Sequence, residues 1–168
     1  MKAHDYADME AHGYRVCSEL AGADQARRIA AVDLSEYQAA LATGCAAAIA
    51  LALESKAKAI YFEYNMDSDW TGSFFICAEY LPESSGDDDW ASDWTNEITG
   101  PPQSELSQIY LENGWRKSPA SVGSTTFLVA RTMAAFGRAG QPYMDSGIAI
   151  CIAYHDQDPI VRAYEPTV

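Results

Sequence analysis

The sequence predicts a single-domain α+β fold, in which helices pack against an antiparallel sheet of about four strands. A length of 168 residues with 48% hydrophobic content is typical of one globular domain. Apolar residues recur at helical spacing through residues 1–57, and at the strand spacing of two in 59–81 and again in 146–165. The predicted order is therefore helices, hairpin, helices and hairpin.

Three helices are expected in the N-terminal part, 1–57. The first runs from Asp5 to Leu20, the second from about Asp24 through Ala31, and the third from Ser35 to about Ser55. Ser35 followed three residues later by a glutamine is a capping-box start. The third helix carries a stripe of mostly small residues, which would let another element pack closely against it: Tyr37, Leu41, Cys45, Ala48 and Ala52.

The stretch 59–81 is expected to form the first hairpin. Large side chains alternate with other residues in 59–65 and again in 73–81, so that Ile60, Phe62 and Tyr64 share one face of the first strand. The link between the two strands is polar and ends in Gly72. A polar link of this kind between two alternating segments favours antiparallel pairing.

The stretch 82–103 is expected to be a long acidic loop rich in tryptophan, with a helical turn near 89–94. Helices are then predicted over 104–139, one of about ten residues ended by Gly114 and one from Ser124 to Arg138. The segment 146–165 is predicted to form the second hairpin. Its first strand, 148–154, alternates large and small residues and is typical of a central strand.

The net charge of −13 is concentrated in residues 59–115. That stretch contains twelve carboxylates and no Lys, Arg or His, so it accounts for −12 of the total, and it also holds all four tryptophans. A negative surface repels nucleic acid and anionic membranes, and we expect neither as a partner. It favours a basic protein or a cation, although acidity that serves solubility alone is equally consistent with this charge.

The cysteines and the N-terminus indicate a cytoplasmic protein. Cys17, Cys45, Cys77 and Cys151 are scattered among apolar or small residues, so buried free thiols are expected. No secretory signal is visible, and the apolar run 45–53 is too short to span a bilayer. We find no zinc motif, phosphate-binding glycine loop or nucleophile motif, and we predict no cofactor, no metal and no catalytic residue.

The densest acidic and aromatic pattern lies in the expected loop, where three adjacent aspartates precede Trp90 and Asp93 precedes Trp94. Either both tryptophans fold inward while the aspartates cap and solvate the loop, or the loop is a binding surface with tryptophan anchors. The second interpretation predicts a partner-binding surface made of the loop and the first hairpin turn: Asp67, Asp69, Trp70, Glu83, Asp87, Asp88, Asp89, Trp90, Asp93, Trp94 and Glu97.

Two other interpretations compete with a protein-binding surface. Asp67 and Asp69, followed by Gly72, resemble the start of a calcium loop, but Ala78 stands where a calcium loop needs a bidentate glutamate, which favours a plain hairpin turn. A small-molecule-binding or enzymatic domain would place a pocket between sheet and helices, lined by Tyr64, Tyr80 and Tyr154.

Three segments resemble parts of the immunity proteins of bacterial polymorphic-toxin systems. They are Tyr61-Phe-Glu-Tyr64, Asp69-Trp70-Thr-Gly-Ser-Phe-Phe75 and Asp88-Asp-Trp-Ala-Ser-Asp-Trp94, and the resemblance covers about 59–100. The resemblance implies a dedicated toxin partner, bound tightly and neutralised by occlusion of its active site. We therefore expect an inhibitor of a basic protein toxin, such as a nuclease or a nucleotide-modifying enzyme, and not an enzyme.

Overall fold

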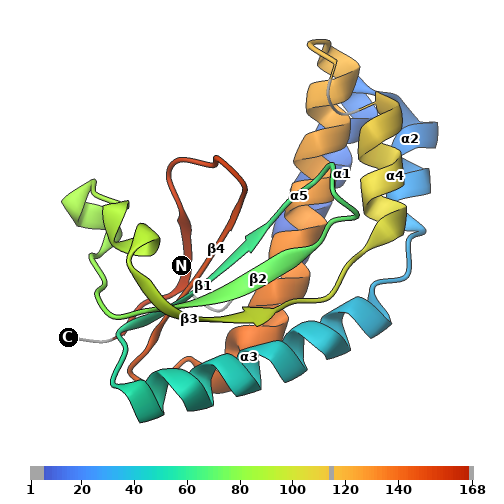
Figure 1. Ribbon diagram of the computed structural model, residues 1–168. Helices are drawn as coiled ribbons and strands as arrows, with labels where there is room; N and C mark the ends of the chain where they lie inside the picture. The colour runs from blue at the N-terminus through green and yellow to red at the C-terminus, as the bar shows by residue number, and fades with distance from the viewer. Residues whose placement is uncertain (1–5, 114–115, 167–168) are drawn as a thin grey trace.

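The computed structural model describes residues 6–113 and 116–166 as one α+β domain, which confirms the predicted fold class (Figure 1). The described elements are α1 (Tyr6–Leu20), α2 (Ala23–Ala30), α3 (Ser35–Ser55), β1 (Ala59–Tyr64), β2 (Gly72–Cys77), β3 (Trp94–Thr99), α4 (Ser104–Asn113), α5 (Pro119–Gly140), β4 (Ala149–Tyr154) and β5 (Val161–Tyr164). Three short 3-10 helices, η1 (Glu83–Ser85), η2 (Asp89–Ser92) and η3 (Gln141–Tyr143), lie in the connections.

The three N-terminal helices lie where the sequence predicts them. All five residues of the predicted stripe on α3 are buried, and α3 packs against β1, β2, β3 and α5. Gly44 shows why small residues matter on this helix. A Cβ atom placed there would come within 2.4 Å of the Phe74 ring, so the helix approaches β2 closely only because it has no side chain at this point.

The sheet has five strands in the order β3-β2-β1-β4-β5, one more than expected. Both predicted hairpins are confirmed, because β1 pairs with β2 and β4 pairs with β5, each antiparallel. The two hairpins are joined by parallel pairing of β1 with β4, so the sheet is mixed and not wholly antiparallel. The added strand, β3, lies in the stretch that we expected to be a loop. Its residues are mostly exposed, so it lacks the apolar alternation by which strands are recognised.

The helix α5 begins five residues earlier than predicted. Ser118 caps it by accepting a hydrogen bond from the Ser121 amide, and Pro119 occupies the first turn. Its residues are buried on nearly every side, because α1, α2, α3, α4 and the strands β4 and β5 all contact it. Two predicted features, the end of the preceding helix at Gly114 and the fourth tryptophan, Trp115, lie outside the described residues.

One face of the sheet is covered by helices and holds the main core. Figure 1 shows α3 lying along this face and α5 crossing beside it, with α1, α2 and α4 gathered around α5. Phe62, Phe74 and Phe136 meet at the centre of this core, where the Phe62 ring lies 4.7 Å from Phe74 and 5.4 Å from Phe136 between centroids. We call this side the helix face.

Among the described residues, the opposite face of the sheet is covered by two connections and no α-helix. They are the segment 78–93 between β2 and β3 and the segment 155–160 between β4 and β5, which Figure 1 shows rising from the same side of the sheet. A second, smaller hydrophobic cluster lies beneath them and contains Tyr61, Cys77, Trp90, Cys151 and Ile160 among others. We call this side the loop face.

By length and composition, α3 is the one described helix that could cross a membrane. The core helix of a soluble protein can meet the same criteria, and the buried stripe of α3 takes part in the main core. All four cysteines are buried free thiols, as predicted.

Candidate protein-binding groove

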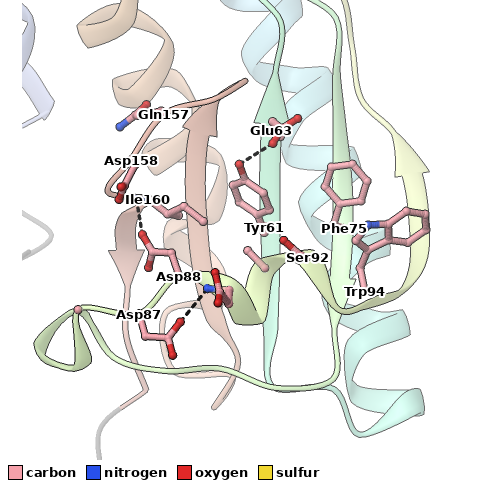
Figure 2. Close-up of a pocket in the computed structure, with 13 residues that line it drawn as sticks. Tyr61, Glu63, Phe75, Asp87, Asp88, Ser92, Trp94, Gln157, Asp158 and Ile160 are labelled. Carbon is pink, nitrogen blue, oxygen red and sulfur yellow. Dashed lines mark hydrogen bonds between the residues drawn. The ribbon is translucent and has the colours of Figure 1, made fainter.

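The loop face contains an open hollow of about 810 Å³, which we call the acidic groove (Figure 2). Its floor is the sheet, and its walls are the segments 86–92 and 157–160. It is lined by Tyr61, Glu63, Phe75, Gly86, Asp87, Asp88, Asp89, Ala91, Ser92, Trp94, Gln157, Asp158 and Ile160. Five of these residues carry carboxylates, three are aromatic, and none is Lys, Arg or His.

The floor of the groove follows from the alternation of side chains along the strands. In β1, Phe62 points to the helix face, so Tyr61 and Glu63 point to the loop face. In β4 the loop face receives only the small residues Ala149, Cys151 and Ala153, while the isoleucines face the helices. These small residues are buried in one cluster with Trp90 and Ile160, and the groove is lined instead by Tyr61, Glu63 and Phe75.

One wall of the groove is held to the sheet by Asp88. Its carboxylate accepts a hydrogen bond of 2.8 Å from the Ile160 amide and forms an ion pair with Arg162 (Figure 2 shows the first). Arg162 is only 6% exposed, and it also donates to the carbonyl oxygens of Ile160 and Leu81. Burial by itself raises the pKa of Asp88, but the bonds from Arg162 and Ile160 outweigh it, so that pKa lies below its usual value.

Trp90 anchors the same wall from beneath. Its side chain is 5% exposed, contacts the Tyr80 ring edge-on at 5.2 Å, and lies under the Arg162 guanidinium, 5.6 Å from it. The inward interpretation is therefore correct for Trp90, and its predicted role as a surface anchor is wrong. Trp94 does not stack with it across a helical turn, because η2 ends at Ser92 and Trp94 begins β3.

The remaining carboxylates of the wall face solvent. Asp87, Asp89 and Asp158 are exposed residues at the groove. Asp87 also caps the turn that follows, because one of its oxygens accepts a 2.9 Å hydrogen bond from the Asp89 amide. The capping interpretation thus applies to Asp87, while its second carboxylate oxygen and the carboxylate of Asp89 add negative charge at the groove.

Glu63 connects the groove floor to the segment 155–160 between β4 and β5. The Tyr61 hydroxyl donates a 2.8 Å hydrogen bond to one oxygen of Glu63, and Nδ1 of His155 lies 3.0 Å from the other. Burial, and then Glu63, raises the pKa of Tyr61, and the contact with Glu63 raises the pKa of His155. The phenol therefore stays protonated at neutral pH, and the added proton on His155 is favoured.

Trp94 forms the exposed aromatic surface of the groove. Its side chain is 45% exposed, the largest exposed fraction among the described tryptophans, and its ring centroid lies 5.1 Å from that of Phe75. Trp94 is thus supported from below and open above, which is the geometry of an aromatic platform for a partner side chain.

Only part of the predicted partner-binding surface meets at the groove. Asp87, Asp88, Asp89 and Trp94 line it, whereas Glu83, Asp93 and Glu97 are exposed outside its lining. Asp67 and Asp69 lie in the turn between β1 and β2, also outside the lining. Trp70, predicted as a contact residue, is fully buried and donates a 2.9 Å hydrogen bond to the Thr132 hydroxyl, so that prediction is wrong.

Sequence reasoning missed the residues of the floor and the second wall. Tyr61, Glu63 and Phe75 alternate with the strand residues that face the main core, and Asp158 belongs to a turn far along the chain. The alternation that marks a strand also marks this second set of positions. It could have identified the first three, but not their proximity to Asp158, which depends on the parallel pairing of β1 with β4.

The structure also bears on the two competing interpretations, the tyrosine-lined pocket and the calcium loop. Tyr64 is buried in the main core, while Tyr80 packs on Trp90 at the loop face, so the three tyrosines of the predicted pocket do not share one. The Asp67–Gly72 link forms a turn closed by a 2.8 Å bond from the Asn65 amide to the Thr71 carbonyl. Within residues 6–113 and 116–166, no group of three or more His, Cys, Asp or Glu is placed to hold a metal ion.

Comparison with known proteins adds no relative to this description. The chain matches no family model, no curated protein and no solved structure. The groove must therefore be interpreted from its own chemistry, which is acidic and aromatic.

Proposed function

We propose that this protein is an immunity-type inhibitor, which binds a basic protein toxin in the acidic groove and occludes the toxin's active site. The observation that supports the proposal most directly is the groove lining, with five carboxylates and no Lys, Arg or His. The nearest arginine, Arg162, is buried in its ion pair with Asp88 and does not offset the exposed carboxylates.

Two physical effects would act in sequence on a basic partner. Exposed carboxylates such as Asp87 and Asp89 attract it from a distance and raise the association rate, most strongly at low salt. Trp94 then offers an aromatic face to a Lys or Arg side chain, a contact worth about 0.5–2 kcal/mol. The exposed charge would thus affect the rate of association, and the aromatic ring of Trp94 would affect the rate of dissociation.

The kinetics of complex formation test this proposal with a matched pair of variants. The partner is a basic toxin encoded beside the gene for this chain, and association is followed over a salt series. The double change Asp87→Asn with Asp89→Asn should slow association and flatten its salt dependence. The control, Glu36→Gln with Glu54→Gln, removes two exposed charges from α3 on the helix face and should change little. The proposal is abandoned if both double variants behave alike, or if the wild-type chain neither binds at micromolar concentration nor protects cells that express the toxin.

The alternative is a small-molecule-binding or enzymatic domain, for which the acidic groove would be the ligand site. Its volume of about 810 Å³ falls within the range of small-molecule sites, roughly 300–1,000 Å³. A thermal-shift titration with arginine, agmatine and spermidine separates the two functions. Stabilisation by one of these compounds at micromolar concentration would favour the alternative, and a flat response favours a protein partner.

A further inference from the structure

The two edges of the sheet are protected very differently. At one edge, β5 is four residues long and three of its residues are buried. At the other edge, β3 is six residues long and all of its residues except Ile98 are exposed. Among the described residues, β3 pairs with β2 alone, so its outer side has no strand partner. Exposed strand edges of this length are templates for pairing with another chain.

Few of the devices that block edge pairing occur in β3, which has one bulge and one charged residue, Glu97. The strand reads Trp-Thr-Asn-Glu-Ile-Thr, with four residues that favour strands and no proline, glycine or lysine. A bulge at Thr95 interrupts the pairing with β2 near the start of the strand, and Asn96 to Thr99 then pair regularly. The regular part is therefore accessible for a further strand.

The hydrogen-bond pattern identifies which backbone groups point outward. The Gly100 amide donates to the Gly72 carbonyl, and the paired residues along β2 and β3 are known. In antiparallel pairing, groups facing the partner alternate with groups facing away. The amides of Asn96 and Ile98 therefore face β2, and those of Glu97 and Thr99 face outward.

The side chains on this edge favour a basic partner strand. Glu97 pairs with Phe75, so its side chain lies on the loop face, the same face as Trp94 and the acidic groove. Glu97 is the one charged residue of β3. A second copy of this chain would bring another net charge of −13 and another Glu97 to the same edge, which argues against self-pairing.

From these observations, we propose that an extended basic segment of the partner protein adds to the outer edge of β3 as a sixth strand, placing alternate Lys or Arg side chains beside Glu97, Trp94 and the acidic groove. This inference rests on the proposed function and specifies how the partner binds. Backbone hydrogen bonds would give affinity, and the alternating basic side chains would give specificity.

A peptide experiment with the full chain tests the edge directly. The probe is a peptide of about ten residues that alternates lysine and threonine, and the control peptide has the same charge but proline at two central threonines. The alternating peptide should bind at least about tenfold more tightly than the control, and the amides of Glu97 and Thr99 should gain protection from hydrogen exchange. Equal affinity of the two peptides, or unchanged exchange at both amides, overturns the proposal.

Variants at Thr99 isolate the backbone contribution. Thr99→Pro removes an outward amide and should weaken peptide binding about tenfold, whereas Thr99→Ala keeps that amide and should stay within about twofold of wild type. If Thr99→Pro does not fold, the exchange measurement on the wild-type chain decides. A free chain that forms a dimer, dissolved by Thr99→Pro, would identify a second copy as the occupant and overturn the proposal.

The toxin itself separates this inference from the proposed function. If the groove variant Asp87→Asn with Asp89→Asn weakens toxin binding and Thr99→Pro leaves it unchanged, the proposed function stands and the added strand is ruled out. If both variants weaken toxin binding while Thr99→Ala does not, both proposals are supported. If the toxin does not bind the wild-type chain at all, the proposed function is wrong, and the peptide experiment alone decides whether β3 accepts a further strand.

Discussion

The two faces of the sheet differ in what covers the side chains that the same strands supply. On the helix face, β1 and β4 supply Phe62, Tyr64, Ile150 and Ile152, and helices close over them. On the loop face, β4 supplies only alanines and a cysteine, and connections cover the sheet incompletely. Helices thus close over the large residues of one face, whereas the connections on the other face leave an open hollow above Tyr61, Glu63 and Phe75, which carboxylates surround. The proposed function assigns binding to the loop face and leaves stability to the helix face, and the tryptophans test that division.

The largest expected effect is the loss of Trp70 from the helix-face core. Trp70→Ala removes a fully buried ring and its hydrogen bond to Thr132, and should lower the free energy of unfolding by about 3–5 kcal/mol. Denaturant unfolding followed by circular dichroism measures it. A loss below about 1 kcal/mol would mean that the ring is not packed as described.

A smaller loss is expected from Asp88, which ties the loop wall to the sheet. Asp88→Asn leaves Arg162 buried without its ion-pair partner, and should cost roughly 2–3 kcal/mol, because Arg162 keeps its bonds to two carbonyl oxygens. The matched control is Asp89→Asn, an exposed neighbour, which should change unfolding by less than about 0.5 kcal/mol.

The contribution of Asp88 should also depend on pH in a defined direction. Its folded-state pKa is depressed, so its stabilisation is fully present above the unfolded value of about 3.9 and is lost as the pH falls through the lower folded-state pKa. The difference in stability between wild type and Asp88→Asn should therefore shrink in that acidic range. A difference that stays constant there would show that the ion pair does not hold the loop.

Replacement of Trp94 should affect partner binding more than stability, the reverse of what is expected for Trp70. Trp94→Ala removes a ring that is 45% exposed and touches Phe75, so unfolding should change by only about 1 kcal/mol. Toxin dissociation should nevertheless become faster, corresponding to about 2 kcal/mol or more if Trp94 is a binding hot spot. Stopped-flow dissociation and denaturant unfolding of the same variant measure the two effects. A large loss of stability with unchanged dissociation would reverse the roles of the two faces.

The sequence predicted the helix face better than the loop face for a physical reason. Helices such as α3 and strands such as β4 bury one periodic stripe, and burial leaves a pattern in the residues. The exposed strand β3 has no such stripe, so the sequence predicts a loop there. The sequence also cannot predict which tryptophan is buried. Burial of Trp70 and exposure of Trp94 depend on tertiary contacts with Thr132 and Phe75.

The sequence predicts the negative charge of the candidate site but not the full set of residues that line it. The run Asp87 to Asp89 and the ring of Trp94 do lie at the groove. The sequence could not show that Asp88 forms an ion pair with Arg162, since the two residues are 74 positions apart. Nor could it show that the turn after β4 forms the second wall, because parallel pairing between distant strands has no local signature.

The smallest expected effect concerns His155, which follows β4 and contacts Glu63 of the groove floor. Its pKa is raised chiefly by the contact with Glu63, and next by the charge of Asp156. A raised folded-state pKa stabilises the fold at pH values below the unfolded value of about 6.5, and this contribution is lost as the pH rises through the folded-state pKa. Glu63→Gln should therefore lower the pKa of His155 and weaken the pH dependence of unfolding in that range. A proton NMR titration of the imidazole measures the pKa, with Asp158→Asn as the control, because it removes a charge from the same loop without removing the hydrogen bond. If the two variants shift the imidazole titration equally, the general negative charge of the groove raises the pKa of His155, and Glu63 has no special role in joining the floor to the segment 155–160.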